Sequence, residues 1–124
     1  MIPSGPHILV VDREYLVAME AERLLSDALS CSVRIAMPHD YIAALAETHF
    51  DVVLIDAGIV NANGVEALQL AQKRGAGLVF TTLTSDAMDN LPRFQGSAKV
   101  AKPFNDADLL AAVQSALAML EPDI

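Results

Sequence analysis

Five short apolar runs divide the chain at regular intervals, and each has the length and composition of a β-strand. They are Ile8–Val11, Ser32–Ala36, Val52–Ile55, Leu78–Thr81 and Ala98–Ala101. The first, third and fourth are almost unbroken apolar stretches, which is typical of strands covered on both faces. The pattern therefore predicts a sheet buried between two layers.

Between these runs, apolar residues recur at helical spacing. The expected helices cover Tyr15–Leu29, Asp40–His49, Gly64–Arg74, Ser85–Leu91 and a last helix that Asn105 caps. In the first helix, the spacing places five apolar residues on the buried side: Leu16, Met19, Leu24, Leu25 and Ala28. Strand and helix alternate five times, which predicts one α/β domain over residues 1–124, with a doubly wound parallel sheet and right-handed crossovers. Residues 1–6 read as a loose arm.

Polar side chains stand where four of the predicted strands end. Asp12 follows the first strand, Asp56 the third, Thr82 the fourth and Lys102 the fifth. The carboxyl ends of parallel strands meet at one edge of the sheet, where ligands of such folds bind. We therefore expect these four side chains to converge on one site.

Composition and charge narrow the partners of that site. The 124 residues are 53% apolar and include 8 Lys and Arg against 16 Asp and Glu, a formal net charge of −8. The few basic residues are scattered, which disfavours binding to nucleic acid or to an anionic membrane. A single cysteine, Cys31, excludes an internal disulfide. No signal-type segment opens the chain, so a cytoplasmic location is expected.

The four residues suit phosphoryl transfer to an aspartate. The carboxylate of Asp56 would act as the nucleophile and form an acyl phosphate. Lys102 would balance charge on the phosphoryl oxygens, and the hydroxyl of Thr82 would donate to one of them. Asp12 would help to hold Mg²⁺, which prefers oxygen ligands.

Four motifs in this order resemble the receiver domain of two-component response regulators, of the single-domain chemotaxis type. They are "ILVVDRE", "DVVLIDAGIVNANG", "VFTTL" and "AKPF". The resemblance implies a flavodoxin-like (βα)5 fold with strand order 2-1-3-4-5. It makes Asp56 the phosphoacceptor, Thr82 the switch hydroxyl and Lys102 the conserved lysine. Asp12, Asp56 and the carbonyl of Gly58 would hold Mg²⁺.

The same resemblance implies partners rather than catalysis. A histidine kinase or phosphotransfer protein would donate the phosphoryl group to a stand-alone receiver, and a downstream protein would read the signal in trans. The chain would not be an enzyme. An aspartate-nucleophile phosphatase usually has a second acid two residues after the nucleophile, where this chain has Gly58. A flavin carrier is disfavoured because no phosphate-cradling loop follows the first strand.

Arg13 is the main departure from the receiver pattern. It stands where the family usually has a second acid that binds the metal, and a guanidinium cannot bind Mg²⁺. We expect Arg13 to pair with Asp56 or Asp12 and to weaken or abolish the metal site. A pseudo-receiver that acts without Mg²⁺-dependent phosphorylation is therefore the alternative function. Lys99 also departs, because it replaces the usual aromatic switch residue.

Overall fold

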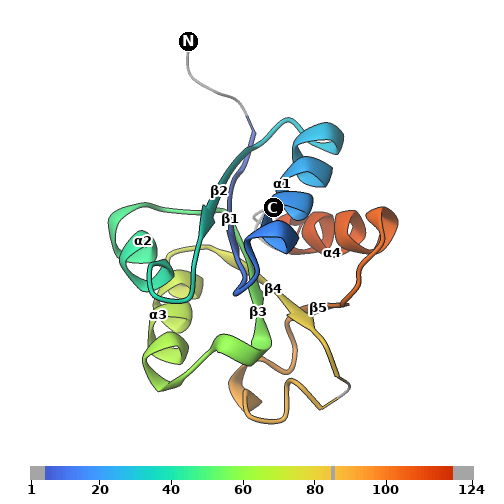
Figure 1. Ribbon diagram of the computed structural model, residues 1–124. Helices are drawn as coiled ribbons and strands as arrows, with labels where there is room; N and C mark the ends of the chain where they lie inside the picture. Colours follow the sequence, from blue (N-terminus) through green and yellow to red (C-terminus); the bar gives the residue numbers. More distant parts are fainter. Residues whose placement is uncertain (1–4, 85, 119–124) are drawn as a thin grey trace.

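The computed structural model describes residues 5–84 and 86–118 (Figure 1). Its centre is a five-stranded sheet in the order β2-β1-β3-β4-β5, in which every neighbouring pair is parallel. The order and the fold class agree with the prediction. The strands are β1 (His7–Val11), β2 (Ser32–Ala36), β3 (Val52–Asp56), β4 (Gly77–Thr82) and β5 (Ala98–Ala101).

Helices cover both faces of the sheet, as the buried strands require. Helices α1 (Tyr15–Ala28) and α4 (Asp106–Ala118) lie on one face, and α2 (Tyr41–Glu47) and α3 (Ala62–Lys73) lie on the other (Figure 1). The strands divide their side chains between the two layers. Val10 and Leu54 pack with α1 and α4, whereas Val11 and Ile55 pack with α2 and α3. Each layer thus has its own apolar core.

The helix expected over Ser85–Leu91 is wrong. Ser85 lies outside the described residues, and residues 86–90 form successive turns that lead into a short 3₁₀-helix, η2 (Pro92–Phe94). Backbone bonds in the turns span three residues, as from Asp89 N–H to the Asp86 carbonyl. The Thr84 hydroxyl donates to the Asp86 carboxylate at 2.6 Å. Such local side-chain bonds compete with helix formation, and the connection from β4 to β5 is therefore made of turns.

The predicted inner face of α1 is also partly wrong. Leu16 and Met19 are 79% and 43% exposed, whereas Ala18 and Leu25 are fully buried. Small alanines at helical spacing let α1 approach the sheet closely. That orientation turns Leu16 outward, at the edge of the sheet where the candidate site lies.

Two helix starts are fixed by asparagine caps. The Asn105 side chain accepts from Asp108 N–H at 2.8 Å, as the sequence predicted. Helix α3 begins at Ala62, two residues before the predicted start, because Asn61 caps it by accepting from Gly64 N–H at 2.9 Å. No helix in the described ranges is long and apolar enough to cross a membrane.

Candidate functional site

The sheet brings two buried carboxylates together at its carboxyl edge. Asp12 follows β1 and Asp56 ends β3, and these two strands are direct neighbours. The two residues are only 3% and 4% exposed. Two ionised carboxylates buried at one edge repel each other and lose hydration, so they need cations or hydrogen-bond donors nearby.

Lys102 supplies the first of these cations. It follows β5, and its ammonium donates to Asp12 Oδ2 at 3.1 Å and to Asp56 Oδ2 at 3.2 Å. The lysine side chain is itself only 11% exposed. Desolvation is the largest single influence on the Lys102 pKa and lowers it. The hydrogen bonds and charges of Asp12 and Asp56 together outweigh it, and they raise the pKa above its ordinary value. Lys102 is therefore a firmly held cation between two anions.

Arg13 supplies the second cation, and the expected ion pair with Asp56 is confirmed. Its Nε donates to Asp56 Oδ2 at 3.2 Å. The guanidinium lies against Gly58, since a Cβ built on Gly58 would stand 2.6 Å from Arg13 Nη2. Unlike Lys102, the Arg13 side chain is 55% exposed. Arg13 therefore covers Asp56 from the solvent side.

The backbone holds the remaining carboxylate oxygens. Asp12 Oδ1 accepts from Glu14 N–H at 2.8 Å, and Asp56 Oδ1 accepts from Gly58 N–H at 2.8 Å. In both cases the donor lies two residues after the aspartate, in the segment that leaves the strand. After β3 this segment is a short 3₁₀-helix, η1 (Ala57–Ile59), which the Asp56 side chain caps. These backbone donors were not predicted from the sequence. An aspartate at the end of a strand, followed directly by a turn, is the signal that could have indicated them.

Thr82 lies where the sequence placed it, as the last residue of β4. In the described part of the chain, however, its hydroxyl makes no hydrogen bond with Asp56 or Lys102; its backbone carbonyl accepts from Lys102 N–H at 2.7 Å. The neighbouring Thr81 is paired with Asp56 in the sheet register, and its hydroxyl is buried without a hydrogen-bond partner. The structure thus joins Asp12, Asp56 and Lys102 directly and leaves Thr82 beside them.

The Mg²⁺ that the receiver resemblance implies does not fit these donors. All four oxygens of Asp12 and Asp56 already accept hydrogen bonds from Lys102, Arg13 or backbone amides. Among the described residues, no group of three or more His, Cys, Asp or Glu side chains is placed to hold a metal ion. A guanidinium lies beside Gly58, the third expected ligand. A divalent cation would meet fixed positive charge here.

An open cleft of about 810 Å³ adjoins the site. Asp56, Lys102 and Arg13 lie on its polar side. Apolar side chains from α1 and from the segments after β4 and β5 complete it, including Leu16, Leu83 and Phe104. The cleft has the size of a small-molecule or side-chain binding site. The cleft therefore opens to solvent next to Asp56 and Arg13.

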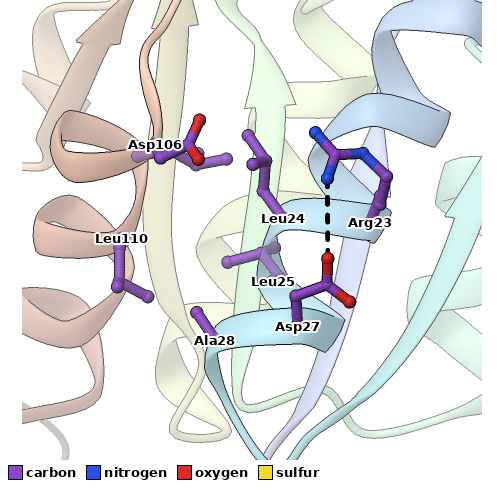
Figure 2. A pocket seen from close by; sticks show the side chains of 8 residues that line it. Arg23, Leu24, Leu25, Asp27, Ala28, Asp106 and Leu110 are labelled. Carbon is purple, nitrogen blue, oxygen red and sulfur yellow. Dashed lines mark hydrogen bonds and ion pairs between the residues drawn. The ribbon is translucent and has the colours of Figure 1, made fainter.

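A second hollow, of about 160 Å³, lies between α1 and α4 (Figure 2). Its polar residues are Arg23, Asp27 and Asp106, and Arg23 pairs with Asp27 at 3.5 Å. Arg23 also donates to Glu20 at 2.6 Å. These side chains belong to two helix surfaces and not to the strand ends, so this hollow is separate from the candidate site.

Lys99 stabilises the connection that precedes β5. Its ammonium donates to the backbone carbonyls of Gln95 at 2.6 Å and Ser97 at 3.1 Å. A lysine has no aromatic ring that could change rotamer, and the ammonium of this one is held by two backbone carbonyls. The aromatic coupling usual in receivers is therefore absent at this position.

Comparisons with known structures show the fold. The chain is similar to the receiver domain of the Francisella response regulator 1452, with 15% identity, a TM-score of 0.74 and coverage of 94% of this chain and 100% of the other. It is also similar to the chemotaxis response regulator CheY4 of Vibrio cholerae, with 20% identity, a TM-score of 0.75 and coverage of 92% and 100%. A response regulator receiver protein from Burkholderia phymatum gives 24% identity, a TM-score of 0.75 and coverage of 92% and 96%.

Sequence comparison gives the family directly. A search of curated proteins finds no significant match. Residues 8–114 match the profile of the response regulator receiver domain, and this range contains Asp12, Asp56 and Lys102. Receiver domains are modules of two-component signalling. The chain therefore belongs to the response regulator receiver domain family.

Proposed function

We propose that Asp56 accepts a phosphoryl group from a histidine kinase or phosphotransfer protein, and that the phosphorylated chain signals by binding another protein. The observation that carries this proposal is the position of Lys102, whose ammonium bridges Asp12 and Asp56. A lysine held beside the nucleophile can neutralise charge on a transferred phosphoryl group. Membership of the receiver family gives the same role to this arrangement.

The chemistry at Asp56 is a direct displacement. A carboxylate oxygen attacks phosphorus and forms the new O–P bond, and the P–N bond of a phosphohistidine breaks. The electron pair leaves with the imidazole, which takes its proton from water. The product is an aspartyl phosphate, and the negative charge on its phosphoryl oxygens falls next to Lys102.

The alternative, a pseudo-receiver that signals without phosphorylation, uses the same ion pair between Arg13 and Asp56 in another way. In a pseudo-receiver, the ion pair between Arg13 and Asp56 would stay formed permanently. Against it stand the half-exposed Arg13 and the open cleft, which leave a route to Asp56.

Acetyl phosphate supplies a test that needs no cognate kinase. The wild type, Asp56→Asn and Asp86→Asn are treated with acetyl phosphate, and intact mass counts the phosphoryl groups gained. Asp86 is a matched control, because its carboxylate also lines the cleft but lies away from Lys102. We expect label on the wild type and on Asp86→Asn, and none on Asp56→Asn. Label that persists in Asp56→Asn, or a wild type that takes no label, would reject the proposal.

A further inference from the structure

We infer that Arg13 takes the place of the metal ion: its guanidinium binds the phosphoryl oxygens, and Asp56 is phosphorylated without a divalent cation. This inference rests on the proposed function and goes beyond it, because it assigns the metal's role to a side chain. It makes Arg13 a phosphoryl-binding residue of this site.

The balance of charge is the first support. Asp12 and Asp56 carry two negative charges at the sheet edge, and Lys102 and Arg13 carry two positive charges within hydrogen-bond distance of them. Within this ion-paired group the charges balance. A bound Mg²⁺ would add two positive charges beside Lys102 and Arg13. The other carboxylates that line the cleft, on Glu14, Glu20 and Asp86, form no metal-binding cluster with Asp12 and Asp56 in the described part of the chain.

The free donors of Arg13 are the second support. A guanidinium has five N–H donors, and in the described structure only Nε is used, toward Asp56. The donors on Nη1 and Nη2 remain for a ligand, and paired N–H donors match the oxygens of a phosphoryl group. Arg13 lines the open cleft together with Asp56, and its Nη2 lies beside Gly58, two residues after Asp56. The guanidinium is therefore next to the volume that a phosphoryl group would enter.

The seat of Arg13 is the third support. Gly58 leaves the space that the guanidinium fills, and Arg13 is 55% exposed while Asp56 is almost fully buried. Because the Arg13 side chain is half-exposed, its guanidinium can shift from the Asp56 carboxylate to a phosphoryl group bound there without disturbing the core. Arg13 can therefore serve both the resting state and the phosphorylated state.

In the transfer step, Arg13 and Lys102 would both neutralise negative charge on the phosphoryl group. As the bond from Asp56 oxygen to phosphorus forms and the bond to the leaving group breaks, negative charge remains on the three other phosphoryl oxygens. The N–H donors of Arg13 and the ammonium of Lys102 neutralise it, which is the main task of a metal ion in such reactions.

Substitutions at residues 13 and 58 separate the effect of the Arg13 charge from the effect of the position of its guanidinium. Arg13→Gln removes the charge, and Arg13→Lys keeps the charge but loses the paired donors. Gly58→Ala leaves arginine intact but puts a methyl group where Nη2 lies, so it should displace the flexible guanidinium from Asp56. Arg23→Gln is the matched control, because Arg23 is an equally exposed arginine that pairs with Asp27 in the hollow of Figure 2 and with Glu20 on α1, and that forms no ion pair with Asp12 or Asp56 in the described structure.

The experiment measures the rate of phosphorylation by acetyl phosphate, in EDTA and in Mg²⁺, with circular dichroism to confirm folding. We expect the wild type and Arg23→Gln to be labelled at the same rate in both buffers. In EDTA, Arg13→Gln and Gly58→Ala should be slower by at least about tenfold, and Arg13→Lys should fall between them and the wild type.

The outcomes distinguish this inference from the proposed function. A wild type labelled only in Mg²⁺ would overturn the role of Arg13 and leave Asp56 as a metal-dependent phosphoacceptor. Equal rates for the wild type and Arg13→Gln in EDTA would do the same. A wild type that is labelled in neither buffer would overturn the proposed function as well.

Discussion

The guanidinium of Arg13 lies against Gly58, so closely that a Cβ on residue 58 would stand 2.6 Å from Arg13 Nη2. The two residues come from different turns, one after β1 and one after β3, and both line the same cleft. The absence of a side chain at residue 58 and the presence of a long cation at residue 13 are therefore one structural arrangement. Four predictions test it and the surrounding fold.

The first prediction concerns Mg²⁺. Arg13→Asp replaces the cation with a third carboxylate beside Asp12 and Asp56, which gives oxygen ligands of the kind that Mg²⁺ prefers. We expect this variant to be stabilised by Mg²⁺ and the wild type to be indifferent to it. At ten times the Kd, mass action gives about 1.4 kcal/mol, or roughly 5 °C in Tm for a domain of this size.

Thermal melting at increasing Mg²⁺ concentration makes that comparison, with Ca²⁺-free buffers and Arg23→Asp as the control for net charge. Arg23→Asp should behave like the wild type. If the wild type and Arg13→Asp respond equally to Mg²⁺, Arg13 does not control metal access.

The second prediction follows from the raised pKa of Lys102. A lysine whose pKa is higher in the folded state stabilises the fold while it is charged in both states, below its ordinary value of 10.5. That contribution is lost as the pH rises through the folded-state pKa. We expect the wild type to lose more free energy of unfolding than Lys102→Gln between about pH 9 and about pH 11.5.

Urea unfolding at several pH values measures this difference. The quantity of interest is the difference in unfolding free energy between the two proteins, because contributions that both proteins share cancel in it. Parallel curves for the wild type and Lys102→Gln would show that Lys102 is not held by the two carboxylates.

The third prediction concerns Tyr41 and Gly64. The Tyr41 hydroxyl is buried and has no hydrogen-bond partner among the residues that the structure describes, and a Cβ on Gly64 would collide with it. Gly64→Ala should therefore destabilise the protein by about 1–3 kcal/mol. Tyr41→Phe should cost little, because it removes an unpaired buried hydroxyl.

A double-mutant cycle tests that collision. In the Tyr41→Phe background, Gly64→Ala should be less destabilising by about 1 kcal/mol or more. The remaining contacts of that Cβ, to Tyr41 Cζ and Val60 Cγ1, are both 3.3 Å and can relax. Additive effects would mean that the glycine is needed for another reason.

The fourth prediction tests the orientation of α1. Leu25 is fully buried, whereas Leu16 is 79% exposed. Leu25→Ala should cost about 2–5 kcal/mol, and Leu16→Ala should change the free energy of unfolding by less than about 0.5 kcal/mol. Chemical denaturation compares the two. Equal losses of unfolding free energy would mean that Leu16 is buried as Leu25 is, as the helical spacing alone predicts.

The strands were predictable because their signal is local. Four or five apolar residues in a row identify a buried strand, and the order of strands and helices then restricts the topology. The predicted strand bounds agree with the structure to within one residue at each end. The placement of Asp12, Asp56 and Lys102 at one edge followed from that topology.

The features that were not predictable depend on packing or on competing local bonds. Helical spacing does not distinguish the side of α1 that Ala18 buries from the side that carries Leu16, because small residues contribute little to the apolar pattern. The turns after Thr84 arise from side-chain bonds that no apolar pattern records. The seat of Arg13 on Gly58 joins two residues that lie far apart in sequence, and only the fold brings them together.

Lys102 also connects the edge of the sheet with its centre. It follows β5, an edge strand, yet its ammonium lies 3.1 Å from Asp12, which follows β1. On a flat sheet those strands would be about 14 Å apart, and the long lysine side chain is what closes most of that distance. A hydrogen bond already 3.2 Å long, such as the one to Asp56, weakens with roughly half an ångström of stretch. Lys102 thus links the outer edge strand to both carboxylates, and a displacement of β5 would change the hydrogen bonds of Asp12 and Asp56 although neither residue belongs to that strand.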